Sequence, residues 1–156
     1  MSNLQTTTIL LVEDNPGHAR LIEKNLRRAN ISNKIILLSD GQQALDYLFS
    51  QGEHVDRRPF RNILMLLDLN LPVLNGYQVL QRMKKDSRTK RIPVVILTTT
   101  DDPQEVDSCY ELGCNLYITK PVEYSQFCKT IRQLGHVLSV VTVPVTEYSS
   151  LSCSDS

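Results

Sequence analysis

Asp68 stands at the end of an apolar run, in a position where a β-strand needs no ionisable group. Residues 63–76 read ILMLLDLNLPVLNG, so one carboxylate follows five apolar side chains and precedes a proline and a glycine. A charge beside buried apolar residues is costly unless it finds a partner. The chemistry of this carboxylate therefore depends on what the rest of the chain brings to the same place.

Other apolar segments of the chain also end in polar side chains. These are Glu13 and Asp14 after residues 7–12, Thr98 after residues 92–97, and Lys120 after residues 115–119. Carboxylates that lie together repel one another unless a cation neutralises them. Oxygen ligands of this kind suit Mg²⁺, a hard cation that uses few carboxylates and keeps several waters.

The elements needed to position these side chains alternate along the chain. Apolar, β-prone segments are expected at residues 7–12, 34–38, 62–67, 92–97 and 115–119, with a helical pattern after each. Continuous apolar strands are typical of a parallel sheet covered on both faces, and crossovers in such sheets are right-handed. We therefore predict an α/β fold with a doubly wound, five-stranded parallel sheet. Its sites lie beyond the carboxyl ends of the strands.

Helix start signals support the same arrangement. Asn15 precedes Pro16, Asp40 precedes Gln43 by three residues, and Asp102 precedes Pro103, all of which indicate N-caps. Gly113 is the expected end of the helix that begins near Pro103.

A carboxylate beside a divalent cation and an ammonium can attack phosphorus and form an aspartyl phosphate. Asp68 is then the nucleophile, while Lys120 and Thr98 contact phosphoryl oxygens. The sequence contains neither a GxxxxGK[ST] nor a GxGxxG motif, so we expect the phosphoryl donor to come from outside.

Four motifs resemble those of response-regulator receiver domains, the CheY-like family with a flavodoxin-like fold. They are LLVEDNP, LLDLNLPVLNG, PVVILTT and YITKP, in that order and on the expected strands. The resemblance implies that Asp68 is the phosphoacceptor and that Lys120 and Thr98 are catalytic. It implies a metal site formed by Glu13, Asp14, Asp68 and the Asn70 backbone carbonyl. It also implies that Thr98 and Tyr117 are the switch residues. It also implies a cis peptide bond before Pro121. The implied cofactor is Mg²⁺, with Mn²⁺ able to replace it.

Within the family, the insert at residues 51–60 and the tail look most like the small regulators paired with cyanobacterial phytochromes. The resemblance implies a single-domain response regulator whose partner is a sensor histidine kinase, with a phytochrome as the candidate. The family usually has Asp where this chain has Asn75, but that position lies in the turn rather than in the site.

Composition sets further expectations. Seventeen basic and seventeen acidic residues give a formal charge of zero, which provides no electrostatic argument for nucleic acid or an anionic membrane surface. The apolar runs are shorter than a membrane span requires, and the first residues are polar, so a cytoplasmic protein is expected. Cys109, Cys114 and Cys128 are predicted to be reduced and partly buried. His18, His54 and His136 are interpreted as surface residues.

The predicted domain comprises residues 7–140, followed by a tail at 141–156 that is either partly mobile or associated with a dimer. Tyr110, Tyr117, Tyr124 and Phe127 account for four of nine aromatic residues and are expected near the last strand and helix. We interpret them as a face that, with residues 138–145, supports a homodimer. Packing of these aromatics into a monomer core is the open alternative.

Two other functions are compatible with parts of this pattern. A haloacid-dehalogenase-type phosphatase also uses an aspartate at a strand end, but it needs a second acid where this chain has Asn70. A phosphorylation-independent docking module would not need the full set of acids, hydroxyl and lysine.

Overall fold

The computed structural model describes residues 7–49, 62–141 and 143–144. The predicted insert at 51–60, His54, Cys153 and most of the expected tail therefore lie outside the described residues. The strands are β1 (Thr8–Val12), β2 (Ile35–Leu38), β3 (Ile63–Leu67), β4 (Val94–Thr98) and β5 (Leu116–Thr119). They form one parallel sheet in the order β2-β1-β3-β4-β5, which confirms the predicted doubly wound fold.

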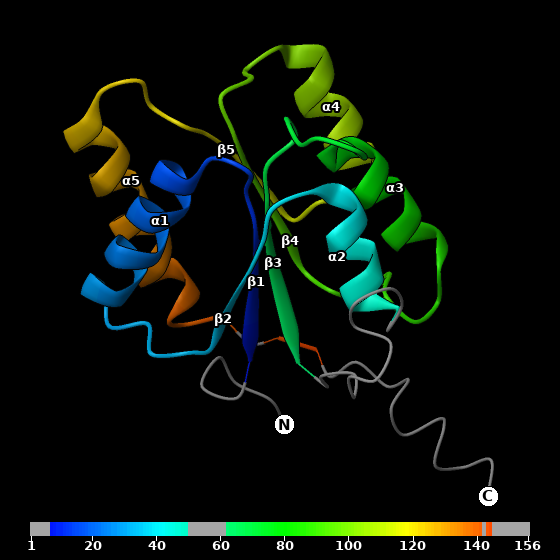
Figure 1. The fold of residues 1–156 in the computed structure, drawn as a ribbon, viewed down its shortest axis with the longest axis horizontal. Coiled ribbons are helices and arrows are strands. Elements are labelled where there is room, and N and C mark those ends of the chain that lie inside the picture. Colours follow the sequence, from blue (N-terminus) through cyan, green and yellow to red (C-terminus); the bar gives the residue numbers. More distant parts are fainter. Residues whose placement is uncertain (1–6, 50–61, 142, 145–156) are drawn as a thin grey trace, which may run out of the picture.

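Five helices connect and follow the strands. They are α1 (Pro16–Arg28), α2 (Gly41–Leu48), α3 (Gly76–Lys85), α4 (Pro103–Leu112) and α5 (Tyr124–Leu138). Helices α1 and α5 cover one face of the sheet, and α2, α3 and α4 cover the other (Figure 1). Within the described part of the chain, no helix combines the length and apolar character needed to cross a membrane.

Alternate residues of each central strand supply the cores on the two faces. On β1, Leu10 and Val12 are buried in the core beneath α2, α3 and α4, while Ile9 and Leu11 are buried beneath α1 and α5. This alternation follows from the two-residue period of a strand. It explains why the strand sequences are apolar throughout. Cys109, Cys114 and Cys128 are free thiols, as predicted, and are buried rather than partly buried.

The predicted N-caps are confirmed. Asn15, Asp40 and Asp102 each accept a hydrogen bond from the backbone of the first helical turn that follows. Asn75, which the sequence placed only in a turn, forms a reciprocal capping box with Gln78 at the start of α3. Each strand begins one residue later than predicted, except the fourth, which begins two residues later, at Val94 rather than residue 92. Pro93 has no N–H to donate to a sheet.

The register of the sheet brings the polar strand ends together. Val12 pairs with Leu67, so Glu13 and Asp68 follow neighbouring positions on adjacent strands. Thr98 pairs with Thr119 and its carbonyl accepts from the Lys120 N–H at 2.6 Å. The order of the strands places β1 and β3 side by side at the centre, where the direction of winding reverses. Ligand sites of doubly wound sheets form at this point.

Gly76 begins α3 in close contact with the backbone that carries the phosphoacceptor candidate. A Cβ at this position would lie 2.1 Å from the Asp68 carbonyl oxygen and 2.8 Å from the Leu69 Cα. These neighbours are backbone atoms and cannot turn away. The Asn-Gly pair therefore sets both the start of α3 and its distance from the loop that follows β3.

Val73 in the same loop has a left-handed backbone, with φ of 68°. Such a conformation costs an L-residue roughly 1–2 kcal/mol, and Val73 is 75% exposed, so little packing compensates. We expect Val73→Gly to stabilise the protein by about 0.5–1 kcal/mol, because glycine tolerates positive φ but has more conformational freedom to lose on folding. Urea unfolding measures the change. Val122→Gly, at an exposed valine without positive φ, is the matched control and should give no gain; equal effects of the two substitutions would contradict the strain.

Candidate phosphoacceptor and metal site

Lys120 lies at the centre of the polar cluster formed by the strand ends. It directly follows β5, and its side chain is 2% exposed. The Nζ atom donates to Glu13 Oε1 at 2.5 Å and to Asp68 Oδ2 at 3.0 Å. A buried ammonium is tolerated only when it is paired and hydrogen-bonded, and here one cation bridges two buried carboxylates.

Glu13 is engaged through both of its carboxylate oxygens. Oε1 accepts from Lys120, and Oε2 accepts from the Asn15 backbone N–H at 3.1 Å. Burial raises the pKa of Glu13 above its ordinary value, and the charge of Asp68 adds to this, although the hydrogen bond and charge of Lys120 oppose both effects. In this structure Glu13 therefore anchors the lysine and the turn that leads into α1.

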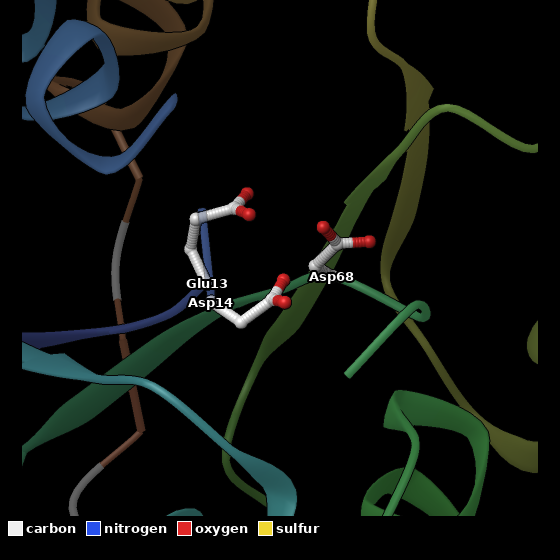
Figure 2. Close-up of side chains that lie close together, drawn as sticks. All are labelled: Glu13, Asp14 and Asp68. Atoms are coloured by element: carbon white, nitrogen blue, oxygen red, sulfur yellow. The ribbon is translucent and has the colours of Figure 1, made fainter. Parts of the chain in front are cut away.

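Asp14 is the exposed member of the acidic cluster. One carboxylate oxygen from each of Glu13, Asp14 and Asp68 lies within 4.8 Å of the others. Figure 2 shows the Asp14 carboxylate pointing toward Asp68. No ion pair or hydrogen bond within the described residues holds the Asp14 side chain. The donor set fits a hard divalent cation, because it consists of oxygens and includes a carboxylate that is free to bind.

Asp68 is buried, at 6% exposure, with both oxygens in defined contacts. Oδ2 accepts from Lys120, and Oδ1 accepts from the Asn70 backbone N–H at 3.0 Å. Each carboxylate oxygen has a second lone-pair site, so the group retains the capacity to bind a metal or to act as a nucleophile.

The Asn70 side chain links the loop after β3 to the end of β4, which sequence reasoning did not anticipate. Its Nδ2 donates to Thr98 Oγ1 and to Thr99 Oγ1, both at 3.4 Å. Thr98 is fully buried, whereas Thr99 is exposed. The structure thus places the buried hydroxyl of Thr98 beside the Asn70 side chain at the carboxyl end of β4.

Tyr117, the predicted switch aromatic, lies half-buried on β5 beside α4. Its hydroxyl donates to the Thr100 carbonyl at 2.7 Å, and its backbone N–H donates to the Tyr110 hydroxyl at 3.1 Å. Burial raises the pKa of Tyr117 to about 12, assisted by nearby acidic groups. The ring is therefore held by the loop that follows Thr98, without direct contact with the carboxylates.

His18 was expected at the surface, and this prediction was wrong. It is half-buried in the first turn of α1, where Nδ1 lies 3.2 Å from Lys120 Nζ. The loop after β5 and the start of α5 pack over this turn. Because this packing is tertiary, the local sequence PGHAR could not indicate it. His136 is exposed, as predicted.

The expected cis peptide bond before Pro121 is also not found. All peptide bonds among the described residues are trans, including Lys120–Pro121. Trans is the isomer that bonds preceding proline favour by roughly 0.5–1 kcal/mol.

The predicted aromatic face divides between surface and core. Tyr110 and Tyr124 are exposed, whereas Phe127 is buried among α1, α5 and the sheet. Val143, in the segment expected to extend this face, is buried in the same core. The alternative of packing into the monomer core therefore holds for Phe127, and Val143 joins the same core.

The order of the strands, the buried aspartate after β3 and the lysine after β5 define a receiver domain. Residues 9–143 match the family described as the response regulator receiver domain, and the chain belongs to this family. Response regulator Rcp1 of Synechocystis sp. (strain PCC 6803) is 40% identical over 137 residues, which cover 87% of this chain and 92% of Rcp1.

Solved structures agree with this assignment. A response regulator receiver domain from Rhodospirillum rubrum superposes with a TM-score of 0.83 at 54% identity, covering 89% of this chain and 98% of that one. The phosphorylated cyanobacterial phytochrome response regulator RcpA gives a TM-score of 0.80 at 37% identity, covering 88% and 97%. Rcp1 itself has been solved in an Mn²⁺-bound form, with a TM-score of 0.81 at 38% identity and coverage of 88% and 98%.

Proposed function

We propose that this protein is a phosphoaccepting signalling switch in which Asp68 receives a phosphoryl group from a sensor histidine kinase. One observation carries the proposal. The buried Asp68 carboxylate is in contact with the Lys120 ammonium and lies beside the free carboxylate of Asp14. A nucleophile, a cation for phosphoryl oxygens and a metal-binding oxygen thus meet at one edge of the sheet.

The proposed step is a transfer of the phosphoryl group without oxidation or reduction. A lone pair of an Asp68 oxygen forms a new P–O bond, while the P–N bond of the kinase phosphohistidine breaks. The imidazole leaves with that electron pair. Lys120 would hold one phosphoryl oxygen, and Thr98 would donate a hydrogen bond to another.

Glu13, Asp14, Asp68 and the Asn70 backbone carbonyl are the residues we assign to Mg²⁺, with Mn²⁺ able to replace it. The contacts of Glu13 with Lys120 and Asn15 leave Asp14 and Asp68 as the carboxylates best placed to bind the ion directly. Bound Mg²⁺ would offset the negative charge that develops on the transferring phosphoryl group. The Mn²⁺-bound form of the relative Rcp1 supports a divalent cation here.

Signal output is proposed to pass through Thr98 and Tyr117. A phosphoryl group of roughly −2 charge would draw the Thr98 hydroxyl toward it, in place of the long contact from Asn70. The loop after β4 would then move, and the Tyr117 hydroxyl, bound to the Thr100 carbonyl in that loop, would lose its partner. A turn of the ring would change the surface near Tyr110.

The relatives also suggest partners. RcpA is named as a phytochrome response regulator, so we propose a phytochrome-type histidine kinase as the phosphoryl donor, acting in the cytoplasm. We propose a homodimer through the exposed Tyr110 and Tyr124 side chains, since tyrosine is enriched at protein interfaces. No contact with nucleic acid or membrane is proposed. The phosphatase alternative is not favoured, because Asn70 stands where it needs an acid and contacts threonines instead.

The test uses the full chain with acetyl phosphate as the donor. In Mg²⁺ we expect intact mass spectrometry to show one added phosphoryl group, which is stable in acid and lost in base. In EDTA the group should not appear. Sedimentation of the same samples reports whether phosphorylation changes the oligomeric state. Failure to label in Mg²⁺ would overturn the proposed function, and monomers in both samples would overturn the dimer alone.

A further inference from the structure

His18 provides the third hydrogen-bond partner of the Lys120 ammonium. Glu13 Oε1 and Asp68 Oδ2 take two of its N–H donors, and His18 Nδ1 lies 3.2 Å away on the third side. A lysine ammonium has three donors and no acceptor. Three acceptors therefore match three donors, and this match requires an imidazole with a free lone pair on Nδ1.

The imidazole is held in place independently of Lys120. Its ring packs edge to face against Phe127 of α5, with ring centroids 5.4 Å apart and an angle of 88° between the planes. The His18 backbone N–H donates to Asn15 Oδ1 at 3.1 Å, which fixes the first turn of α1. The ring is thus packed against α5 and its backbone is fixed at the start of α1, apart from any contact with the lysine.

His18 faces the apolar ring of Phe127 on α5 and three charged groups. They are Lys120 after β5, Asp68 after β3, and Asp14 in the loop between β1 and α1. Burial lowers the pKa of His18 below its ordinary value, the Lys120 charge lowers it further, and the two aspartates oppose the change. At neutral pH the ring is therefore uncharged and able to accept a hydrogen bond at Nδ1.

We propose that His18 is a positioning residue for phosphoryl transfer, because its neutral imidazole holds the Lys120 ammonium between Glu13 and Asp68. The role rests on the proposed function of Asp68. An imidazolium has no acceptor and would place a second cation 3.2 Å from Lys120. Protonation of His18 would thus displace the lysine from the position in which it meets the phosphoryl group.

Two substitutions separate the effect of the hydrogen-bond acceptor at residue 18 from the effect of His18 protonation. His18→Asn places an amide oxygen near the position of Nδ1, so it retains an acceptor that does not titrate. His18→Leu retains an apolar side chain against Phe127 but removes the acceptor. Neither changes the N-cap hydrogen bond, which uses the backbone of residue 18. Melting curves check that both variants fold.

The rate of phosphorylation by acetyl phosphate in saturating Mg²⁺ is measured from about pH 5 to about pH 8, the range in which histidine titrates. At the upper end we expect His18→Leu to be roughly tenfold slower than the wild type, the effect of losing one hydrogen bond to a charged group. His18→Asn should stay close to the wild type there and should lose less rate as the pH falls. Equal rates and equal pH profiles for the wild type and His18→Leu would overturn the proposal.

A second measurement does not depend on phosphorylation. Proton NMR titration gives the pKa of His18 in the wild type and in Lys120→Gln. Loss of the neighbouring positive charge should raise the pKa of His18. An unchanged pKa of His18 would overturn the proposed contact between His18 and Lys120. If the wild type is not phosphorylated at all, the proposed function and the positioning role both fail. The titration still tests the contact between His18 and Lys120 in that case.

Discussion

Asp68→Asn is expected to abolish phosphorylation by acetyl phosphate while the protein remains folded. The amide keeps the shape of the side chain and its capacity to accept from Lys120, but it is not nucleophilic toward phosphorus. Removing one of three clustered carboxylates also relieves repulsion with Glu13 and Asp14, so the melting temperature should not fall. Intact mass spectrometry after incubation in Mg²⁺ measures the labelling.

Asp101→Asn is the matched control, because Asp101 is an exposed aspartate in the loop after β4, at the same edge of the sheet. We expect it to be labelled like the wild type. Labelling of Asp68→Asn at the wild-type level would show that another side chain accepts the phosphoryl group. The site would then have to be assigned to a different carboxylate.

Lys120→Met is expected to have the largest effect on stability. The substitution keeps an unbranched side chain of similar length but leaves Glu13 and Asp68, both buried, without the cation that bridges them. Breaking a buried pair by removing one partner typically costs about 3–5 kcal/mol. Urea unfolding at neutral pH in EDTA measures this loss. Lys129→Met, at an exposed lysine of α5, is the control and should change stability by no more than about 0.5 kcal/mol.

The loss of stability caused by Lys120→Met should also depend on pH. Burial already raises the folded-state pKa of Glu13 above its ordinary value of 4.5, and loss of the lysine would raise it further. A carboxyl group with a raised pKa binds a proton more tightly in the folded state, so stability falls as the pH rises from 4.5 through the folded-state pKa. The difference between the variant and the wild type should therefore be smaller near pH 5 than at neutral pH. A difference that does not change with pH would contradict the burial of an unpaired Glu13.

The main elements of the site could be predicted from the sequence because parallel strands end at the same edge of a sheet. Asp68 and Lys120 each follow an apolar segment, so recognising the strands was enough to bring both side chains to that edge. The contact between Lys120 and Asp68 confirms the convergence. Thr98 could be placed only by its register, because three threonines in a row offer two side chains on the same side of the strand.

Other features depend on tertiary packing that the sequence does not encode locally. The position of His18 follows from α5 and the loop after β5 folding over α1, more than one hundred residues further along the chain. The side chain of Asn70, after β3, contacts Thr98 and Thr99 at the end of the neighbouring strand β4. Glu13 was predicted only as a metal ligand, whereas the structure adds its contacts with Lys120 and Asn15.

Site mapping of the wild-type protein shows whether Asp68 itself becomes a phosphoaspartate. The full chain is incubated with acetyl phosphate and Mg²⁺, and the acyl phosphate is then reduced with borohydride, which converts the modified aspartate into homoserine. Peptide mass spectrometry should find homoserine at position 68 and unmodified aspartate at positions 14 and 101. Homoserine at another position, with Asp68 intact, would contradict the account.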